Sequence, residues 1–438
     1  MPDNSGLYWR CVTLLGRLDA TDEHRSEAAD LLPALDPDEL YGQILGSRVY
    51  LPALANVRLL EPTSRTAAVL GHLEALVTQE QQRRAAAHDE TLTVLTGAAA
   101  RNAQVIKGLS LREHYARPEL RHEGDIDLHV RDWSSAWSVV EMLRARGWDW
   151  DTTEFSWLKW TDGGHLYGQL TLVLPDNETP VSRVDLHIGP FSVGHAGNMP
   201  LTGWRIADVM GVRSTVPDCE TELALIAAHA LNDSVLSMKD VNDLHTILQQ
   251  PASTDWATVE ELCRAAQAQD VLAQLLSVTG NVYPEHEVRS ATRPEALVLR
   301  QAAEERVDRA ARLALRDELA RRGSAEAAER MAQEARRYYS ADLRPRVIGS
   351  TDTVSPLGRN RHTCVRLLPL STWSRLKKDT PVPHVVEHSE QSWAPGLRLV
   401  TSGSGQVVRA SDEIFVPTVW GDVHPTSLAL ADQLSPRA

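Results

Sequence analysis

Cysteine is scarce in this sequence, and its spacing shows no pairing pattern. The four cysteines lie far apart and form no CxxC motif: Cys11, Cys219, Cys263 and Cys364. The sequence therefore indicates neither a zinc-binding motif nor a disulfide framework. The motifs GxxxxGK[ST], GxGxxG and HExxH are also missing, so P-loop, dinucleotide-binding and zincin chemistry are not indicated.

Long apolar runs and an excess of positive charge are missing as well. No stretch approaches the roughly 18 apolar residues that a membrane helix needs, and no signal peptide is visible at the start. We therefore expect a cytoplasmic protein without a membrane partner. Lys and Arg number 45 against 59 Asp and Glu, giving a net charge of −14. Because nucleic-acid binding needs concentrated Lys and Arg, long nucleic acid is disfavoured as a partner.

The composition is that of an ordinary globular protein. The chain has 438 residues, of which 42% are hydrophobic and 24% charged. Apolar periodicity and helix-forming residues predict a helical region over 1–95, an α/β core over 96–215, a helical domain over 216–345 and a β-rich or irregular segment over 346–438. The predicted fold class is α+β, with a mixed β-sheet flanked by N- and C-terminal helical regions.

Local patterns give the expected elements of these four parts. Helices are predicted at 63–88, at 134–146 with Ser134 as N-cap, at 220–231 with Asp218 as cap, at 239–249, and at 295–339 as one helix or two. Strands are predicted at 104–107, 124–130, 155–160, 167–174 and 181–188, and a hairpin at 397–400 and 406–409.

The strongest chemical signal is the strand that carries Asp125 and Asp127. Side chains two apart on a strand point the same way, so both carboxylates project from one face. Two neighbouring carboxylates repel each other when desolvated, and hard oxygen ligands suit magnesium. When the motif is taken alone, a surface strand with two solvated acids explains it better, because DxD often occurs by chance.

Two companions favour a functional site. Asp185 lies on a second short alternating strand, and Lys107-Gly108 ends a strand just before a predicted helical turn. A glycine turn lets backbone N–H groups approach phosphate oxygens. This layout predicts phosphoryl-group chemistry, in which the turn holds a triphosphate and the aspartates hold metal ions. Asp185 is also expected to accept a proton from the attacking group.

These residues give the sequence a family resemblance. The run from Val105 through Ser110, followed by Tyr115, Arg121 and the Gly-Asp-Ile-Asp-Leu strand, resembles the nucleotidyltransferase superfamily. Within it, the Lys-Gly turn and the later Val-Asp-Leu-His strand are most similar to a bacterial branch of uncharacterised nucleotidyltransferases. Many members of the wider superfamily carry Gly-Ser at the turn, where this sequence has Lys107-Gly108, so Lys107 is expected to supply charge to the triphosphate instead.

The resemblance implies a function and a set of site residues. The expected enzyme uses Mg²⁺ or Mn²⁺ and transfers a nucleoside monophosphate, with AMP from ATP as the expected case, to a small-molecule, peptide or protein acceptor. The expected catalytic and metal-binding residues are Asp125, Asp127 and Asp185. The expected nucleotide-binding residues are Lys107, Gly108, Ser110, Arg121 and Lys239, the last from the helical domain.

Other interpretations stay open at this stage. The chain could be a catalytically silent protein that binds a nucleotide or a partner, as in a toxin–antitoxin or regulatory pair. It could also be a nucleotidyltransferase that modifies tRNA or another nucleic acid, although the net charge disfavours this. Arg121 alone could equally pair with Glu123 or an aspartate, and Lys107 could be a solvated residue at a strand end.

Overall fold

We describe a computed structural model of the chain. The structure describes residues 5–151, 156–161, 164–174, 182–193, 197–233, 236–250, 254–284, 365–369, 388–402, 405–410, 413–418 and 425–434. In these segments, no helix combines the length and the apolar character needed to cross a membrane. The predicted helix at 295–339 and the link at 175–180 lie outside the described residues.

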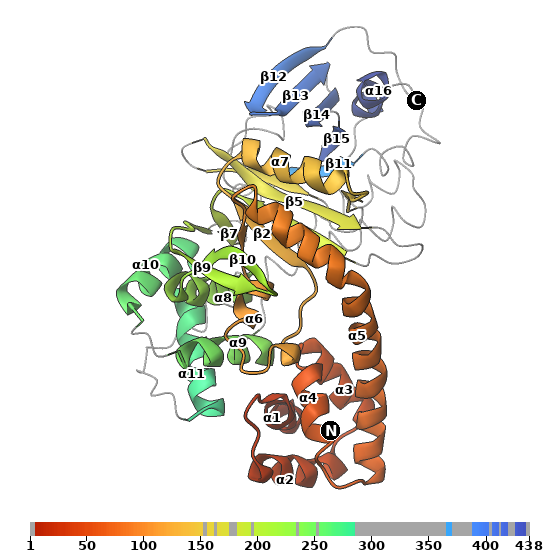
Figure 1. Cartoon of the computed structure of the whole chain (residues 1–438), viewed down its shortest axis with the longest axis vertical. Coiled ribbons are helices and arrows are strands. Elements are labelled where there is room, and N and C mark those ends of the chain that lie inside the picture. Colours follow the sequence, from red (N-terminus) through yellow and green to blue (C-terminus); the bar gives the residue numbers. More distant parts are fainter. Residues whose placement is uncertain are drawn as a thin grey trace, which may run out of the picture.

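The N-terminal region is helical, as predicted. It comprises α1 (Ser5–Gly16), α2 (Asp22–Leu31), the 3₁₀ helix η1 (Leu32–Ala34), α3 (Pro37–Gly46), α4 (Tyr50–Val57) and α5 (Ser64–Ala99). Side chains at the helix starts explain these boundaries, because Asp36 accepts hydrogen bonds from two backbone N–H groups of α3 and Thr63 accepts one from α5. The 36-residue α5 is longer than predicted and runs from the N-terminal helices to the sheet (Figure 1).

One large mixed sheet forms the centre of the molecule. Its described strands are β1 (Gln104–Val105), β2 (Ile126–Val130), β3 (Asp149–Trp150), β4 (Trp157–Trp160), β5 (Leu166–Leu174), β6 (Ser182–Ile188), β11 (Val365–Pro369), β12 (Ser389–Ala394), β13 (Leu397–Ser402), β14 (Gly405–Ala410) and β15 (Glu413–Thr418). The strand order is β1-β2-β6-β5-β4-β11-β15-β14-β13-β12, with β3 paired to β5. Among these pairs, β2 and β6 run parallel and the others antiparallel. The prediction of an α+β fold with a mixed sheet is confirmed.

The two faces of the sheet differ in polarity because strand residues alternate. Ile126, Leu128 and Val130 on β2 are buried in one core with the end of α5 and with α7 (Trp133–Arg144). The intervening residues, Asp127 and His129, lie on the other face. The cap of α7 is Asp132, whose side chain accepts from the Ser135 N–H, so the predicted N-cap at Ser134 is wrong by two residues.

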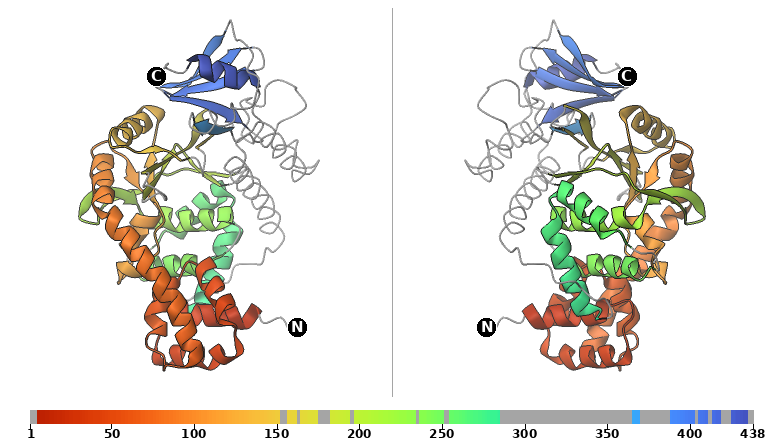
Figure 2. Two further views of the ribbon diagram at one scale, coloured as in Figure 1. Left: turned by 90° about the vertical axis from the view of Figure 1, so that its right-hand side faces the viewer. Right: turned by 90° about the vertical axis from the view of Figure 1, so that its left-hand side faces the viewer.

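The C-terminal strands continue the central sheet. β11 pairs with β4 on one side and β15 on the other, and β13 with β14 confirms the predicted hairpin. Figure 2 shows these strands and α16 (Pro425–Leu434) at the end of the molecule opposite the N-terminal helices. The division into four parts stays a prediction.

Helices after the sheet form the remaining core. They are α8 (Cys219–Asp233), α9 (Met238–Leu248), α10 (Trp256–Ala266) and α11 (Gln269–Val282), preceded by the pairs β7 (Phe191–Val193) with β8 (Gly197–Met199) and β9 (Trp204–Val209) with β10 (Val212–Pro217). Asp218 caps α8 as predicted, accepting from the Thr221 N–H. The helices pack on Ile106, which precedes the short helix α6 (Gly108–Arg112), and on Leu111 within that helix.

The close pairing of β4 and β5 depends on a glycine. A Cβ at Gly168 would lie 2.2 Å from the Trp157 carbonyl oxygen, which is backbone and cannot rotate away. We expect Gly168→Ala to lower the free energy of unfolding by about 1–3 kcal/mol. Gly71→Ala is the matched control, since a Cβ there meets nothing within 4 Å in helix α5; it should raise stability by about 0.5–1 kcal/mol. Urea unfolding of both variants checks this, and equal stability changes would contradict it.

Candidate active site

The three predicted aspartates come together at the β2 and β6 strands. Asp127 and Asp185 are direct partners in the parallel register, so their side chains project from the same face of the sheet. Both are buried, with 4% and 5% of their surface exposed. Asp125 lies one residue before β2 and is half-buried. The sheet therefore holds carboxylates from two adjacent strands close together in a poorly solvated place.

Lys107 lies directly on this cluster. Its Nζ is 2.8 Å from Asp127 Oδ1 and 3.2 Å from His187 Nε2, and its side chain is 16% exposed. His187 Nε2 is in turn 2.9 Å from the same Asp127 oxygen. A nitrogen that donates to Asp127 cannot also accept from Lys107, so we assign the His187 Nε2–H tautomer, with Asp127 Oδ1 accepting from both neighbours.

The backbone of the Lys107-Gly108 turn is unusual. Lys107 has φ 52° and ψ −118°, a conformation that favours glycine. The chain therefore leaves the extended conformation at Lys107, and Gly108 starts α6. The predicted strand over 104–107 is too long, because β1 covers only Gln104–Val105. Ser110 is fully buried, and its hydroxyl donates to the Lys107 carbonyl. The strained position aims the Lys107 side chain at the carboxylates.

A second cation binds Asp185. Arg183 lies two residues earlier on β6, so the two side chains share a face. Its Nε donates to Asp185 Oδ1 at 3.0 Å and its Nη2 to Oδ2 at 2.9 Å. The sequence contained this signal in the two-residue spacing, but the prediction gave Arg183 no role. Two of the three carboxylates thus carry cations supplied by the chain.

The charges shift the proton affinities in opposite directions. Burial, together with the charges of Asp127 and Asp185, raises the pKa of Asp125 to about 7. Burial also raises the pKa of Asp185, although Arg183 opposes the shift. For Asp127 the effect of burial is outweighed by Lys107 and His187, which hold its pKa below the usual range. The cluster therefore retains strong mutual repulsion despite its two cations.

The geometry of the cluster is that of an ion-paired site. Among the described residues, no group of three or more His, Cys, Asp or Glu side chains is arranged to hold a metal ion. Lys107 and Arg183 approach the oxygens of Asp127 and Asp185 instead. The metal-binding role of the aspartates stays a prediction.

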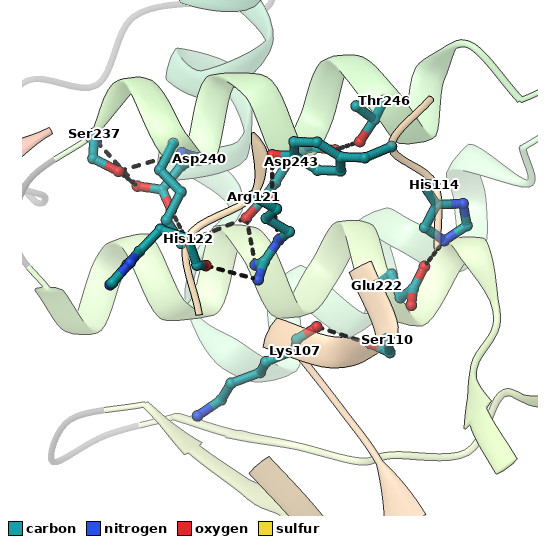
Figure 3. A network of polar contacts seen from close by, with 12 residues as sticks. Lys107, Ser110, His114, Arg121, His122, Glu222, Ser237, Asp240, Asp243 and Thr246 are labelled. Carbon is teal, nitrogen blue, oxygen red and sulfur yellow. Dashed lines mark hydrogen bonds and ion pairs between the residues drawn. The ribbon is translucent and has the colours of Figure 1, made fainter. Parts of the chain in front are cut away.

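A buried ion-pair network lies above the turn and joins it to α9 (Figure 3). Arg121, 2% exposed, donates from Nε and Nη2 to the two Asp243 oxygens at 2.9 and 3.0 Å. Tyr115 donates to Asp243 Oδ1 at 2.7 Å, and Lys239 Nζ lies 3.1 Å from Oδ2. These contacts lower the pKa of Asp243, against the effect of burial. Four polar side chains thus satisfy one another inside the protein.

This network bears on two predicted nucleotide-binding residues. Of the two pairings considered from the sequence, Glu123 or an aspartate, the structure shows the second, because Arg121 pairs with Asp243. Lys239 contacts Asp240 and Asp243, and Asp240 also closes a capping box with Ser237 at the start of α9. In Figure 3, Lys107 extends away from this network. A nucleotide contact by Arg121 or Lys239 stays a prediction, and the structure gives both residues a place in the internal scaffold.

Helix α5 fixes the segment between the network and the aspartates. Arg83 Nη2 donates to the Glu123 carbonyl at 2.8 Å, and Arg84 Nη2 donates to the Arg121 carbonyl at 2.9 Å. Both arginines also pair with the buried Glu80 on the same helix. The sequence gave these residues only as part of a helical stretch, because a contact over about 40 positions has no local signature.

The two histidines of the strands have different surroundings. His187 touches Asp127 and therefore lies inside the cluster. Burial and Lys107 lower its pKa to about 4. His129 packs away from the aspartates, stacked on Trp204 with its ring nitrogens against Gln104 and the Gly189 carbonyl. His129 is thus a packing residue.

A buried carboxylate pair from strands of a mixed sheet, with a basic turn beside it, defines a site typical of phosphoryl-transfer proteins. The comparison with known families makes this specific. A family described as "Uncharacterised nucleotidyltransferase" matches residues 33–284, more than half of the chain, and the chain belongs to this family. Membership supports a transferase. A search of curated proteins found no match.

The Arg121–Asp243 network predicts a large stability effect. Asp243→Asn should lower the free energy of unfolding by about 3–5 kcal/mol, because it leaves the buried Arg121 charge without its carboxylate partner and removes one of the two carboxylates beside Lys239. Asp89→Asn, at an exposed position of α5, should change it by less than about 0.5 kcal/mol. Urea unfolding measures both, and a loss below about 1 kcal/mol for Asp243→Asn would contradict the role of this network.

A second polar cluster lies where α6 meets α8. His114 Nε2 contacts Glu222, and Glu113 Oε2 lies 3.5 Å from Arg205 Nη1, while Glu113 Oε1 is buried without a hydrogen-bond partner. Burial raises the pKa of Glu113 to about 7, despite the opposing charge of Arg205. Because the folded state holds this proton more tightly than the unfolded state, Glu113 must lose it at a cost as the pH rises.

Glu113→Gln should therefore change the pH dependence of stability. In the wild type, the Glu113 contribution is fully present below its ordinary pKa of 4.5 and is lost as the pH rises to about 7. The variant should lose less stability than the wild type between pH 5 and pH 8. Urea unfolding across this range tests the difference, and parallel pH profiles would refute the assignment.

Proposed function

We propose that the chain is a metal-dependent nucleotidyltransferase that moves a nucleoside monophosphate from a nucleoside triphosphate to an acceptor and releases pyrophosphate. AMP from ATP is the expected case. The observation that carries the proposal is the pairing of Asp127 with Asp185 on parallel strands, with Asp125 beside them. Membership of the nucleotidyltransferase family supports the same reaction class and a nucleotidyltransferase-type core around this sheet.

The donor set suits a hard divalent cation. Asp125, Asp127 and Asp185 offer carboxylate oxygens, which Mg²⁺ and Mn²⁺ prefer, and their mutual repulsion would be relieved by positive charge. These three residues would hold the metal. When bound, Mg²⁺ supplies Lewis-acid stabilisation of charge on the attacking and leaving oxygens.

The chain's own groups would position the triphosphate. The Lys107-Gly108 turn lies beside the aspartates, and Lys107 provides an ammonium group that a phosphate can accept from. Ser110 stabilises the turn through the Lys107 carbonyl, so its hydroxyl acts on the shape of the loop. Arg121 holds the segment before the aspartates through Asp243.

The reaction balances without another reactant. An acceptor oxygen forms a bond to the α-phosphorus, the bond to the pyrophosphate oxygen breaks, and the acceptor proton passes to a carboxylate, for which Asp185 is the candidate. A polar row on the same face continues from His187 across the sheet through Gln169 and Trp157. This row offers a surface for a small-molecule, peptide or protein acceptor, in keeping with the acidic net charge.

One observation favours a second candidate. Lys107 and Arg183 neutralise two of the three carboxylates, which is also what a silent nucleotide- or partner-binding protein would show. Such a protein could bind a triphosphate through Lys107 without any transfer. Retention of all three aspartates favours the enzyme, because binding alone needs none of them.

Pyrophosphate release distinguishes the two candidates. The full chain is mixed with each α-labelled triphosphate, Mg²⁺ or Mn²⁺ and pools of acceptors. Asp127→Asn and Asp185→Asn should each lower the rate at least about 100-fold, because they remove carboxylates that would hold the metal ion, and with it the positive charge that stabilises the attacking and leaving oxygens. Asp89→Asn, an exposed aspartate of α5, is the matched control and should keep the wild-type rate.

Two results would contradict the proposed enzyme. Full activity in Asp127→Asn would show that the assignment of the active site to these aspartates is wrong. Triphosphate binding by the folded wild type without turnover in any acceptor pool would favour the silent binder.

A further inference from the structure

Lys107 contacts a carboxylate oxygen that the proposed metal site would use. Its Nζ is 2.8 Å from Asp127 Oδ1, with 16% and 5% of the two side chains exposed. A cation that binds this oxygen must share it with a charged ammonium group in a poorly solvated place, where like charges repel strongly. Lys107 and a metal ion at Asp127 are therefore competitors.

The carboxylates hold Lys107 in place. Asp127, Asp125 and Asp185 together raise the pKa of its ammonium group, against the effect of burial. Its other near neighbours are the neutral His187 ring and the Phe191 ring, whose centroid lies 5.0 Å from Nζ. Neither of these two neighbours offers an anion, so Lys107 leaves the three aspartates only if another anion arrives.

The two cations of the cluster differ in how easily they can move. Arg183 grips both oxygens of Asp185 with a planar guanidinium from the same strand. Lys107 touches one oxygen of Asp127 with a single ammonium on a flexible four-carbon stem. Its backbone has a positive φ of 52°, so the contact is made from a strained position. Lys107 is thus the displaceable cation of the two.

We propose that Lys107 is an internal counter-ion that blocks metal binding in the empty site and transfers to the triphosphate when nucleotide binds. The proposal rests on the metal site of the proposed function. The nucleotide supplies the phosphate oxygens that Lys107 needs in order to release Asp127. Metal and triphosphate should therefore bind with positive coupling, each strengthening the other.

The test measures binding of Mn²⁺ without turnover. Free Mn²⁺ is followed by electron paramagnetic resonance with the full chain, alone or with an ATP analogue carrying an α,β-methylene link, which cannot transfer AMP. The analogue binds Mn²⁺ by itself, and this affinity is measured separately. Beyond that contribution, the analogue should tighten Mn²⁺ binding by the wild type about tenfold or more. Lys107→Gln should bind Mn²⁺ alone about tenfold more tightly than the wild type, and its coupling should largely vanish.

Further variants separate charge from folding. Lys107→Gly removes the ammonium group and suits the backbone conformation, so it should fold even if Lys107→Gln does not. Lys107→Arg keeps the charge and should keep weak Mn²⁺ binding. Arg264→Gln, at an exposed position of α10, removes one positive charge elsewhere and should leave the Mn²⁺ affinity at the wild-type value.

The outcomes separate this inference from the proposed function. One result would overturn the role of Lys107 but leave the metal site intact. In it, Asp127→Asn abolishes Mn²⁺ binding, whereas folded Lys107→Gln or Lys107→Gly binds Mn²⁺ no more tightly than the wild type. Mn²⁺ binding that Asp127→Asn does not affect, with or without the analogue, would overturn the metal site and with it the proposed function.

Discussion

The repulsion among three carboxylates at β2 and β6 is the constraint on which the site depends. The parallel register sets Asp127 beside Asp185, and the apolar residues between them bury the strands. A cluster of this kind is stable only with positive charge nearby. The chain supplies that charge through Lys107 and Arg183, so the protein folds with an ion-paired site. The ion pairs that stabilise the folded cluster therefore use the same carboxylate oxygens that the proposed metal ion would need.

The surrounding structure serves to hold Lys107 in range of the aspartates. The turn that carries it is followed by α6, and the segment between α6 and β2 is held by Arg121 through Asp243 on α9. From the other side, Arg83 and Arg84 of α5 bind carbonyls of the same segment. Helices from before and after the sheet thus fix the approach to the site. A residue with strained backbone torsions persists only where such contacts determine it.

The sequence was sufficient for the features that depend on local alternation. Strand polarity predicted a shared face for Asp125 and Asp127 and marked Asp185 as the acid of a second strand, and the Lys-Gly turn gave a basic residue upstream. That the two strands are neighbours came from the structure. The sequence could not show that Arg121 binds Asp243, because a contact over 122 positions depends on how α9 packs. The positive φ of Lys107 could not be predicted from the sequence either, because lysine has no preference for that conformation. The sequence also could not show that the C-terminal strands continue the sheet, because the pairing of β11 with β4 joins segments far apart in the chain.

That long-range pairing bears on where an acceptor can lie. In register, His187 is followed across the sheet by Gln169, Trp157 and then Arg366 on β11. All face the side of the aspartates, because direct partners in a sheet share a face. Arg366 lies beyond residues 33–284, the part that matches the family. The face that carries the aspartates is therefore built partly from strands outside that region. In the proposed reaction, an acceptor that lies along this row would contact strands from both parts of the chain.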